Sequence, residues 1–333
     1  MAVQASAIAA APVHDAPGLP LLSGFGFNRA QSIAFLVLLA IVLAGPFFLY
    51  PVLLMNVLCF ALFACAFNLL IGYVGLLSFG HAMFFGTGGY IAAHTAKVWG
   101  LTPELAILAG GVVGAALGAV AGWIAIRRQG IYFAMITLAL AQMVYFFYLQ
   151  APFTGGEDGI QRVPRGALLG LIDLRADMTL YWLVAVIFLA GFLFISRIVH
   201  SPFGQVLKAI RENEPRAVSL GYRVDDYKLL AFTLSATLAA IAGGAKAIVF
   251  GIATLTDVYW TMSGEVVLMT LLGGLGTMFG PVVGAAVIIV MQNMLAELGA
   301  WVTVIQGAIF VACVLAFRAG IMGELGRALK VRL

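Results

Sequence analysis

Charged residues are scarce in this sequence of 333 residues. Asp, Glu, Lys and Arg make up 10% of it, whereas hydrophobic residues make up 63%. A soluble globular chain is about a quarter charged and about half apolar. The mean hydropathy is +1.08, and the apolar runs are longer than a buried core helix needs. The composition therefore excludes an ordinary soluble domain and predicts a polytopic membrane protein.

Cysteine is also scarce, and the signature motifs of common enzymes are missing. Cys59, Cys65 and Cys313 lie in apolar segments without metal-ligand spacing, so we expect small core hydrophobes. The sequence contains no Gly-Lys dipeptide and hence no Walker A phosphate loop, and it has no HExxH or GxSxG motif. We expect no catalytic residue, no metal site and no cofactor, so any energy for transport must come from a partner.

Basic residues gather in a few places, and they explain the net charge of +4 without a nucleic-acid partner. They cluster at Arg127-Arg128, in the loop 198–228 and in the C-terminal tail 319–333. Cytoplasmic loops of membrane proteins carry an excess of Lys and Arg, so we place all three in the cytoplasm. The loop 152–178 has more acids than arginines and is expected outside.

Long apolar runs define the membrane domain, which we expect over residues 32–318 after a disordered, Ala- and Pro-rich tail 1–31. Residues 31–71 would form a helix of about 60 Å, twice the hydrocarbon thickness, so they contain two spans with a hinge near Pro46–Pro51. The sequence predicts an all-α polytopic bundle of about eight to ten spans. Further spans are expected at 103–126, 131–150, 179–196, 229–250 and 301–317.

Glycine interrupts two apolar segments, near 72–98 and 263–285, which we expect to be broken or re-entrant. Paired interrupted segments in the two halves of a transporter point to the substrate site. Glycines spaced by four residues also give a helix a smooth face for a close neighbour. We assign that packing role to Gly110, Gly114, Gly118, Gly122, Gly276, Gly280 and Gly284.

Polar side chains inside apolar segments cost free energy, so they are candidates for a substrate pathway. The candidates are Asn68, Tyr73, Ser78, His81, Thr137, Gln142 and Glu265. The alternatives are interhelical hydrogen bonds, a packed histidine, and a Glu265 placed in the first turn of its helix. Lys246 is expected to snorkel to the outer interface. The spans carry no ladder of carboxylates, which argues against a proton- or sodium-driven carrier.

The loop 198–228 contains an amphipathic pattern over residues 203–221. Pro215 interrupts it, so two short helices or one kinked helix are expected. The alternative is an inert helix lying on lipid. Because acids such as Glu212 and Glu214 dilute any attraction to an anionic leaflet, the mixed charges favour a protein partner.

The segment ENEPRAVSLGYR resembles the coupling loop of ABC-importer permeases, a short helix that docks in a cleft of the ATPase subunit. Glu214, Ala217 and Gly221 match that motif, and Pro215 departs from it by replacing a small residue. Together with Arg211 and Glu212, these residues are the expected ATPase-coupling contacts.

The wider resemblance is to the M-type permease subunit of branched-chain amino-acid ABC importers. It is carried by GYVGLLSFGHAMFFGTGGY (72–90), RRQGIYFAMITLALAQ (127–142), TGGEDGI (154–160), SPFGQVLKAIRENEPRAVSLGY (201–222), YKLLAF (227–232) and GEVVLMTLLGGLGTMFGPVVGA (264–285).

The resemblance implies a multi-pass protein of the bacterial inner membrane, surrounded by lipid, that moves Leu, Ile and Val inward by ATP-driven alternating access. It also implies a homologous H-type permease, two ATPase subunits and a periplasmic substrate-binding protein as partners. Relatives of this kind also import urea, short amides or aromatic acids. A channel or carrier independent of ATP is the alternative from another class.

Overall fold

The computed structural model describes residues 28–168, 170, 172–296, 299, 301–316 and 319–329, so the tail predicted over 1–31 lies almost wholly outside the described residues. The α-helices are α1 (Arg29–Phe48), α2 (Pro51–Tyr73), α3 (His81–Lys97), α4 (Pro103–Ala125), α5 (Ile131–Gln150), α6 (Asp177–His200), α7 (Pro202–Glu212), α8 (Glu214–Ser219), α9 (Val224–Phe250), α10 (Trp260–Gly273), α11 (Gly280–Leu295), α12 (Trp301–Ala316) and α13 (Gly320–Leu329). The short elements are η2 (Pro152–Thr154), η3 (Gly156–Asp158), η4 (Leu255–Asp257), β1 (Ile160–Gln161), β2 (Ala167–Leu168), β3 (Ile172–Asp173) and β4 (Ile252–Ala253).

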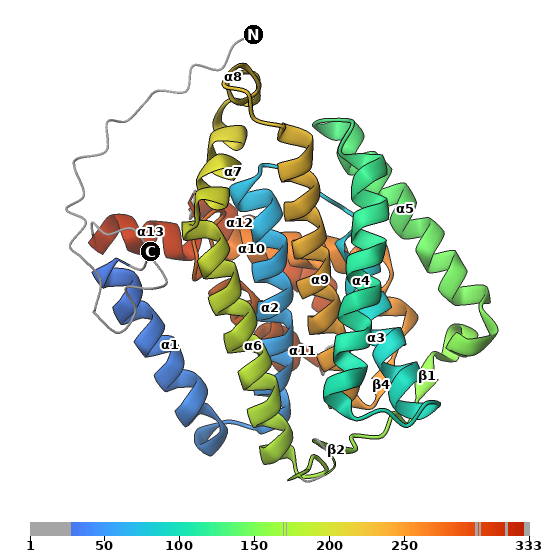
Figure 1. Ribbon diagram of the computed structural model, residues 1–333. Helices are drawn as coiled ribbons and strands as arrows, with labels where there is room; N and C mark the ends of the chain where they lie inside the picture. The colour runs from blue at the N-terminus through green and yellow to red at the C-terminus, as the bar shows by residue number, and fades with distance from the viewer. Residues whose placement is uncertain are drawn as a thin grey trace.

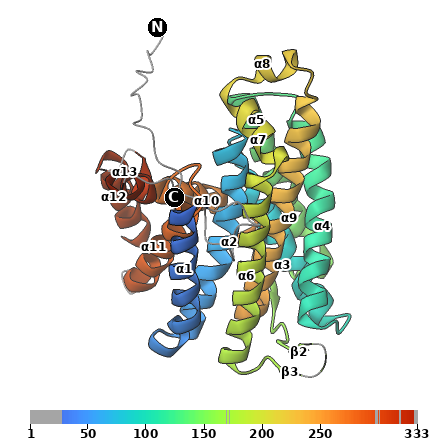
Figure 2. The same ribbon diagram turned by 60° about the vertical axis from the view of Figure 1, so that its left-hand side comes forward.

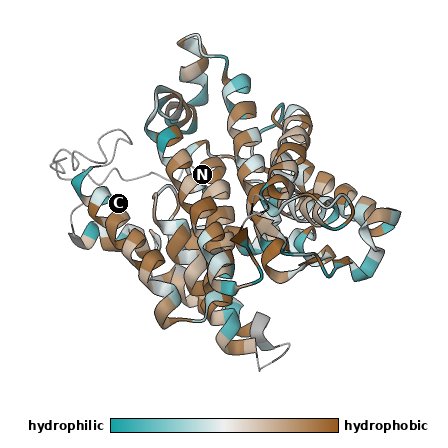
Figure 3. Ribbon diagram, turned by 60° about the horizontal axis from the view of Figure 1, so that its bottom comes forward, coloured by the Kyte–Doolittle hydropathy of each residue, from teal (hydrophilic) through white to brown (hydrophobic). Residues whose placement is uncertain are grey.

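The prediction of an all-α polytopic membrane bundle is confirmed. Among the described residues, 6 helices are long and apolar enough to cross a membrane: α1, α2, α4, α5, α6 and α9. The helices α3, α10, α11 and α12 have 14 to 17 residues, fewer than the roughly 20 that a straight crossing needs. Figure 3 shows hydrophobic residues along most helices and hydrophilic ones mainly at helix ends and in the connecting segments.

Helix α2 lies at the centre of the bundle, between α6, α9, α10 and α11 (Figures 1 and 2). Every residue from Leu58 to Leu70 is buried. A helix that is apolar all round has no face suited to water, and burial on every side follows. The core of the protein is therefore built around α2, and a polar group on α2 needs a partner from a neighbouring helix.

The first two helices meet at the predicted hinge. Helix α1 ends at Phe48, and α2 begins with Pro51 in its first turn, where the missing N–H of proline costs no helical hydrogen bond. Asn28 caps α1 in a reciprocal pairing with Gln31. The helix therefore starts at Arg29, three residues before the boundary expected at residue 32.

A tight layer of three helices, α3, α4 and α9, depends on glycine. A Cβ added at Gly114 or Gly118 would lie 2.2 Å or 2.5 Å from the Cβ of an alanine on α9. Gly122 meets Leu229 and Phe232 of α9, and Gly110 faces the backbone of Gly88 on α3. The four glycines therefore lie on the face of α4 that packs against α9 and α3.

We expect Gly243→Ala to disrupt this layer. A Cβ at Gly243 would lie 1.8 Å from the carbonyl oxygen of Phe85, so the backbones of α3 and α9 would have to separate. Overpacking of this kind costs about 1–3 kcal/mol or more. The expected result is a large loss of monodisperse protein in detergent, measured by size-exclusion chromatography. The matched control is Gly307→Ala on α12, where nothing lies within 4 Å; equal yields of both variants would contradict the prediction.

The two polar loops lie at opposite ends of the bundle (Figures 1 and 2). Helices α7 and α8, from the loop 198–228, form one end. The segment 152–178 forms the other, where β1 pairs with β4 and β2 pairs with β3, both antiparallel. Arg165 ties this segment to α6 through Asp177, at 2.6 Å, and to α9 through the carbonyl of Val249, at 3.0 Å.

The two glycine-rich segments are interrupted as predicted. One break separates α2 from α3 at residues 74–80, and the other separates α10 from α11 at 274–279. The expected packing face of Gly276, Gly280 and Gly284 needs a correction. Gly276 lies in the second break with φ 73°, whereas α11 begins only at Gly280, so the three glycines do not share one helix.

Candidate functional site

Pro215 divides the amphipathic segment into α7 and α8. Asn213 separates them, and its side chain accepts a hydrogen bond from the backbone N–H of Arg216, at 3.1 Å. Pro215 then sits in the first turn of α8, a position that proline favours. Gly221 closes α8 with φ 88° in a Schellman arrangement, because the N–H of Gly221 bonds to Val218 and that of Tyr222 to Ala217.

The partners of Glu214 in this structure are residues of the same chain. Its Oε1 accepts hydrogen bonds from Lys228 Nζ at 2.6 Å and from Gln129 Nε2 at 2.8 Å. The side chain of Lys228 is only 2% exposed. A buried ammonium needs a partner, so Glu214 neutralises Lys228 and holds α8 against α9 and the turn before α5.

The side chain of Arg211, on α7, lies beside the two helix breaks. Its Nη1 donates a hydrogen bond to the carbonyl oxygen of Gly72, in the last turn of α2. A Cβ at Gly75 would lie 3.1 Å from Arg211 Cγ, and one at Gly276 would lie 3.1 Å from Nη1. Helix α7 therefore contacts both interrupted segments through one side chain.

Of the remaining residues expected to contact an ATPase, Ala217 is buried and Glu212 is exposed. Ala217 is buried with Ile210 and Val224, so this part of the apolar stripe packs on the protein itself. The apolar side of the segment 203–221 therefore packs partly on the protein itself, whereas Val218 is 56% exposed. Val218, Leu220 and Tyr222 present exposed apolar surface at the tip around α8.

Asn68 of α2 binds the backbone of the second break. Its Nδ2 donates to the carbonyl of Thr277 at 2.9 Å, and its Oδ1 accepts from the N–H of Gly276 at 3.1 Å. A broken helix leaves backbone groups unpaired, and in a membrane these need protein partners. Gly320, the first residue of α13, packs on Gly274 of the same break, so part of the predicted tail 319–333 is a helix docked there.

Most of the other pathway candidates have partners within the protein. His81 is fully buried, and its Nε2 lies 2.8 Å from Ser235 Oγ on α9. Thr137 accepts from the N–H of Phe79 at 3.2 Å, and Ser78 accepts from that of Gly80 at 3.2 Å. Tyr73 is buried under Lys208, whose Nζ lies 5.8 Å from the ring centroid. Gln142, on α5, is partly exposed.

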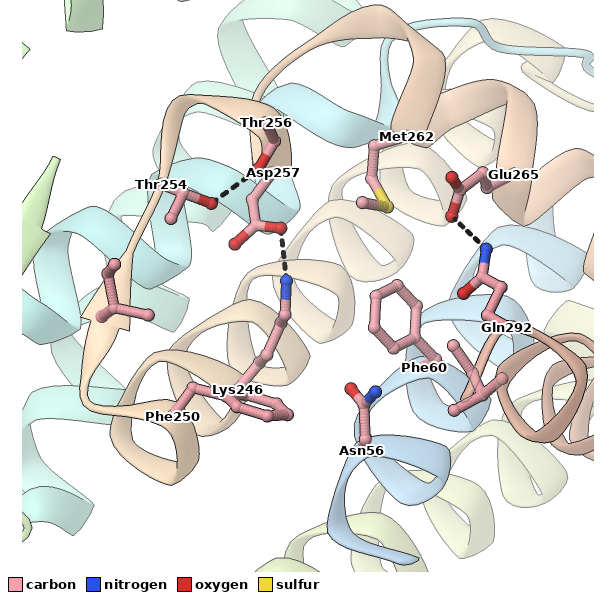
Figure 4. Close-up of a pocket in the computed structure, with 12 residues that line it drawn as sticks. Asn56, Phe60, Lys246, Phe250, Thr254, Thr256, Asp257, Met262, Glu265 and Gln292 are labelled. Carbon is pink, nitrogen blue, oxygen red and sulfur yellow. Dashed lines mark hydrogen bonds and ion pairs between the residues drawn. The ribbon is translucent and has the colours of Figure 1, made fainter. Parts of the chain in front are cut away.

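Glu265 lies in a different place, a pocket of about 460 Å³ at the end of the bundle opposite α8 (Figure 4). Its lining contains both apolar and polar side chains. The lining residues are Asn56, Phe60, Lys246, Phe250, Ile252, Thr254, Thr256, Asp257, Met262, Glu265, Ile289 and Gln292.

Two expectations about this region were wrong. Glu265 lies in the second turn of α10, not the first, because the helix already begins at Trp260. Lys246 does not snorkel to the interface. Its Nζ forms an ion pair with Asp257 of η4 and lies 5.3 Å from the ring centroid of Phe60. Asp257 is close to Lys246 in the sequence. However, the chain turns through β4 to place Asp257 beside Lys246, and no sequence pattern predicts that turn.

Several helices contribute the polar groups in and around the pocket. Gln292 of α11 donates to Glu265 Oε2 and to Gln306 Oε1 of α12, both at 3.4 Å. Asn56 of α2 points into the pocket in Figure 4, and within the described part of the chain its Oδ1 is buried without a hydrogen-bond partner. The sequence analysis missed Asn56, Asp257 and Gln292; the one available signal was Lys246, the only charge in residues 229–250.

A bundle of apolar helices with two broken segments, a polar pocket at one end and two short helices at the other fits a multi-pass membrane permease. The family described as branched-chain amino acid transport system / permease component matches residues 50–314. The chain belongs to this family.

Relatives include two proteins described as high-affinity branched-chain amino acid transport system permease protein LivM. The one from Salmonella typhimurium is 27% identical over 313 residues, covering 86% of this chain and 73% of the relative. The one from Escherichia coli K12 is 28% identical over 267 residues, covering 73% and 63%. An autoinducer 2 import system permease protein, LsrC of Klebsiella pneumoniae, is 31% identical over 181 residues, covering 52% and 50%. No solved structure matches the chain.

Proposed function

We propose that this chain is the membrane permease subunit of an ABC importer that moves Leu, Ile and Val into the cytoplasm by ATP-driven alternating access. The observation that carries the proposal is the α7–α8 element. Glu214 and Lys228 fix α8 to the bundle, while Arg211 of α7 reaches Gly72, in the last turn of α2 before the first break. A push or pull on α8 would therefore be transmitted to both interrupted segments.

The proposal includes the other subunits. Two ATPase subunits would bind at the α8 end, where Val218, Leu220 and Tyr222 are exposed, and a homologous H-type permease would complete the pathway. A periplasmic binding protein would deliver substrate at the opposite end. This arrangement places the loop 198–228 and the C-terminus in the cytoplasm of a bacterium, and the chain in its inner membrane. ATP hydrolysis would belong to the ATPases alone.

The test of the energy source is reconstitution. We expect the complete importer in proteoliposomes to accumulate labelled leucine only when ATP is inside, on the side of α8. The permease pair without its ATPases is expected to transport nothing above empty liposomes. Uptake without ATP would instead support a channel or carrier.

The test of the substrate is competition with the complete importer. We expect unlabelled valine and isoleucine to abolish labelled leucine uptake, and urea and benzoate to leave it unchanged. Urea, short amides and aromatic acids are the substrates of the alternative within the same family, and strong competition by urea or benzoate would favour it.

A further inference from the structure

We propose that the pocket around Lys246, Asp257 and Glu265 binds the substrate as a zwitterion, an α-amino acid with an apolar side chain. This inference rests on the proposed function and assigns the residues that would contact the substrate. The Lys246 Nζ would bind the carboxylate, and Asp257 and Glu265 would receive the ammonium group. The side chain would lie against the apolar wall.

The ion pair between Lys246 and Asp257 is matched to a zwitterion. Lys246 and Asp257 are paired in this structure, and their side chains are only 19% and 12% exposed. A ligand carrying one positive and one negative group would open this pair and supply each partner with a new one, so neither Lys246 nor Asp257 would be left alone. A ligand with a single charge, such as a carboxylate without an amine, would leave Asp257 or Lys246 unpaired.

The hydrogen-bonding groups fit as well. A primary ammonium has three N–H donors. The pocket offers three acceptors from three elements: a carboxylate oxygen of Asp257 on η4, one of Glu265 on α10, and the unpartnered Oδ1 of Asn56 on α2. Such a buried, unpaired acceptor costs free energy until a donor reaches it. A bound ammonium would remove that cost.

The remaining wall suits an aliphatic side chain. Phe60, Phe250, Ile252, Met262 and Ile289 line the pocket between the polar groups. The volume of about 460 Å³ falls in the usual range for small-molecule sites. Neutral urea would open no ion pair and cover little of this apolar surface, so the pocket distinguishes the substrate classes that the sequence left open.

The position of the pocket agrees with a delivery site. It lies at the end of the bundle opposite α8, and its rim is formed by β4 and η4, which join the segment 152–178 through the β1–β4 pairing (Figures 1 and 4). Glu265 and Gln292 also connect it to α10 and α11, whose break Arg211 approaches at the other end. Substrate bound here would therefore contact helices that the coupling element reaches.

The test uses the complete permease–ATPase complex in lipid nanodiscs, without a binding protein, and measures its thermal stability against ligand concentration. We expect L-leucine to stabilise the complex. 4-Methylpentanoate, which lacks the amine, and isopentylamine, which lacks the carboxylate, should bind at least about 30-fold more weakly. Equal stabilisation by leucine and either single-charge analogue would overturn the proposal.

Variants separate a binding site from a structural ion pair. We expect Lys246→Met and Asp257→Asn each to weaken leucine binding by about 30-fold or more, since each removes one partner of a buried charge pair. The double exchange Lys246→Asp/Asp257→Lys keeps an ion pair and should restore the unliganded stability. It should not restore leucine binding, because the positive and negative groups of the pocket would have changed places relative to the apolar wall. Restored binding in the exchange variant would overturn the proposal.

The matched control is Arg165→Met/Asp177→Asn, which removes another ion pair at the same end of the molecule but outside the pocket. It should leave leucine binding unchanged. If the wild-type importer takes up leucine while Lys246→Met and Asp257→Asn bind it normally, the pocket assignment is wrong and the proposed function stands. If the wild-type importer takes up urea and not leucine, both are wrong.

Discussion

Glu214→Lys is expected to abolish transport. The substitution places a second ammonium beside Lys228, whose side chain is 2% exposed, and removes the carboxylate that neutralises it. Breaking a buried ion pair from one side costs about 3–5 kcal/mol, which is more than a hundredfold in the population of α8 docked on α9. Labelled leucine uptake by the complete importer should fall to background, and co-purification of the ATPase should fall with it.

The charge exchange Glu214→Lys/Lys228→Glu is the internal control, because it restores the ion pair and should recover part of the uptake. Asp173→Lys makes the same charge change at an exposed pair with Arg175, at 3.9 Å, at the opposite end of the bundle. Exposed pairs contribute about 0–1 kcal/mol, so that variant should behave as wild type. Normal uptake and ATPase co-purification in Glu214→Lys would rule out the coupling role of α8.

Arg211→Ala should uncouple ATP hydrolysis from transport. It removes the hydrogen bond from the guanidinium to Gly72 and the contact with the break at Gly276, while leaving α8 and its exposed surface in place. A hydrogen bond to a charged group contributes about 1.5–3 kcal/mol, so the transmitted effect should weaken about 10- to 100-fold. The measurement is the ratio of leucine transported to ATP hydrolysed in proteoliposomes.

Two variants bracket this result. Arg211→Lys keeps the positive charge but offers one compact donor in place of the fork, so partial coupling is expected. Arg223→Ala removes an arginine whose side chain is 84% exposed in its ion pair with Asp226, and coupling should be unchanged. A wild-type ratio in Arg211→Ala would show that α7 does not transmit movement through Gly72.

The sequence predicted the helices well because their signal is local. Apolar runs of bilayer length gave α4 and α5 within a residue or two, and prolines marked the turn between α1 and α2. The predicted ends were less accurate for α6 and α9, because both helices extend several residues beyond the apolar spans into polar sequence. Hydropathy reports the lipid-facing length of a helix and not where its hydrogen bonding stops.

The candidate residues were harder to interpret, because the same polar side chain can bind a substrate or another helix. His81 and Asn68 were chosen for being polar at membrane depth, and the structure gives each a protein partner, Ser235 and the break at Gly276. Those partners lie more than 150 residues away in the chain. Asp257 lies in a short polar link, where an acid is ordinary, so its position in the sequence gives no signal of a site.

The sequence by itself determined the class of protein, most of the helices, the two interruptions and the amphipathic segment 203–221, because each depends on composition or on neighbours within a few residues. The tertiary structure alone decided which groups meet. It joined Arg211 to Gly72, buried Lys228 against Glu214, and gathered Lys246, Asp257, Glu265 and Asn56 around one pocket. The physical reason is that a buried charge or an open backbone group must find a partner, and packing of distant helices determines which partner lies within reach.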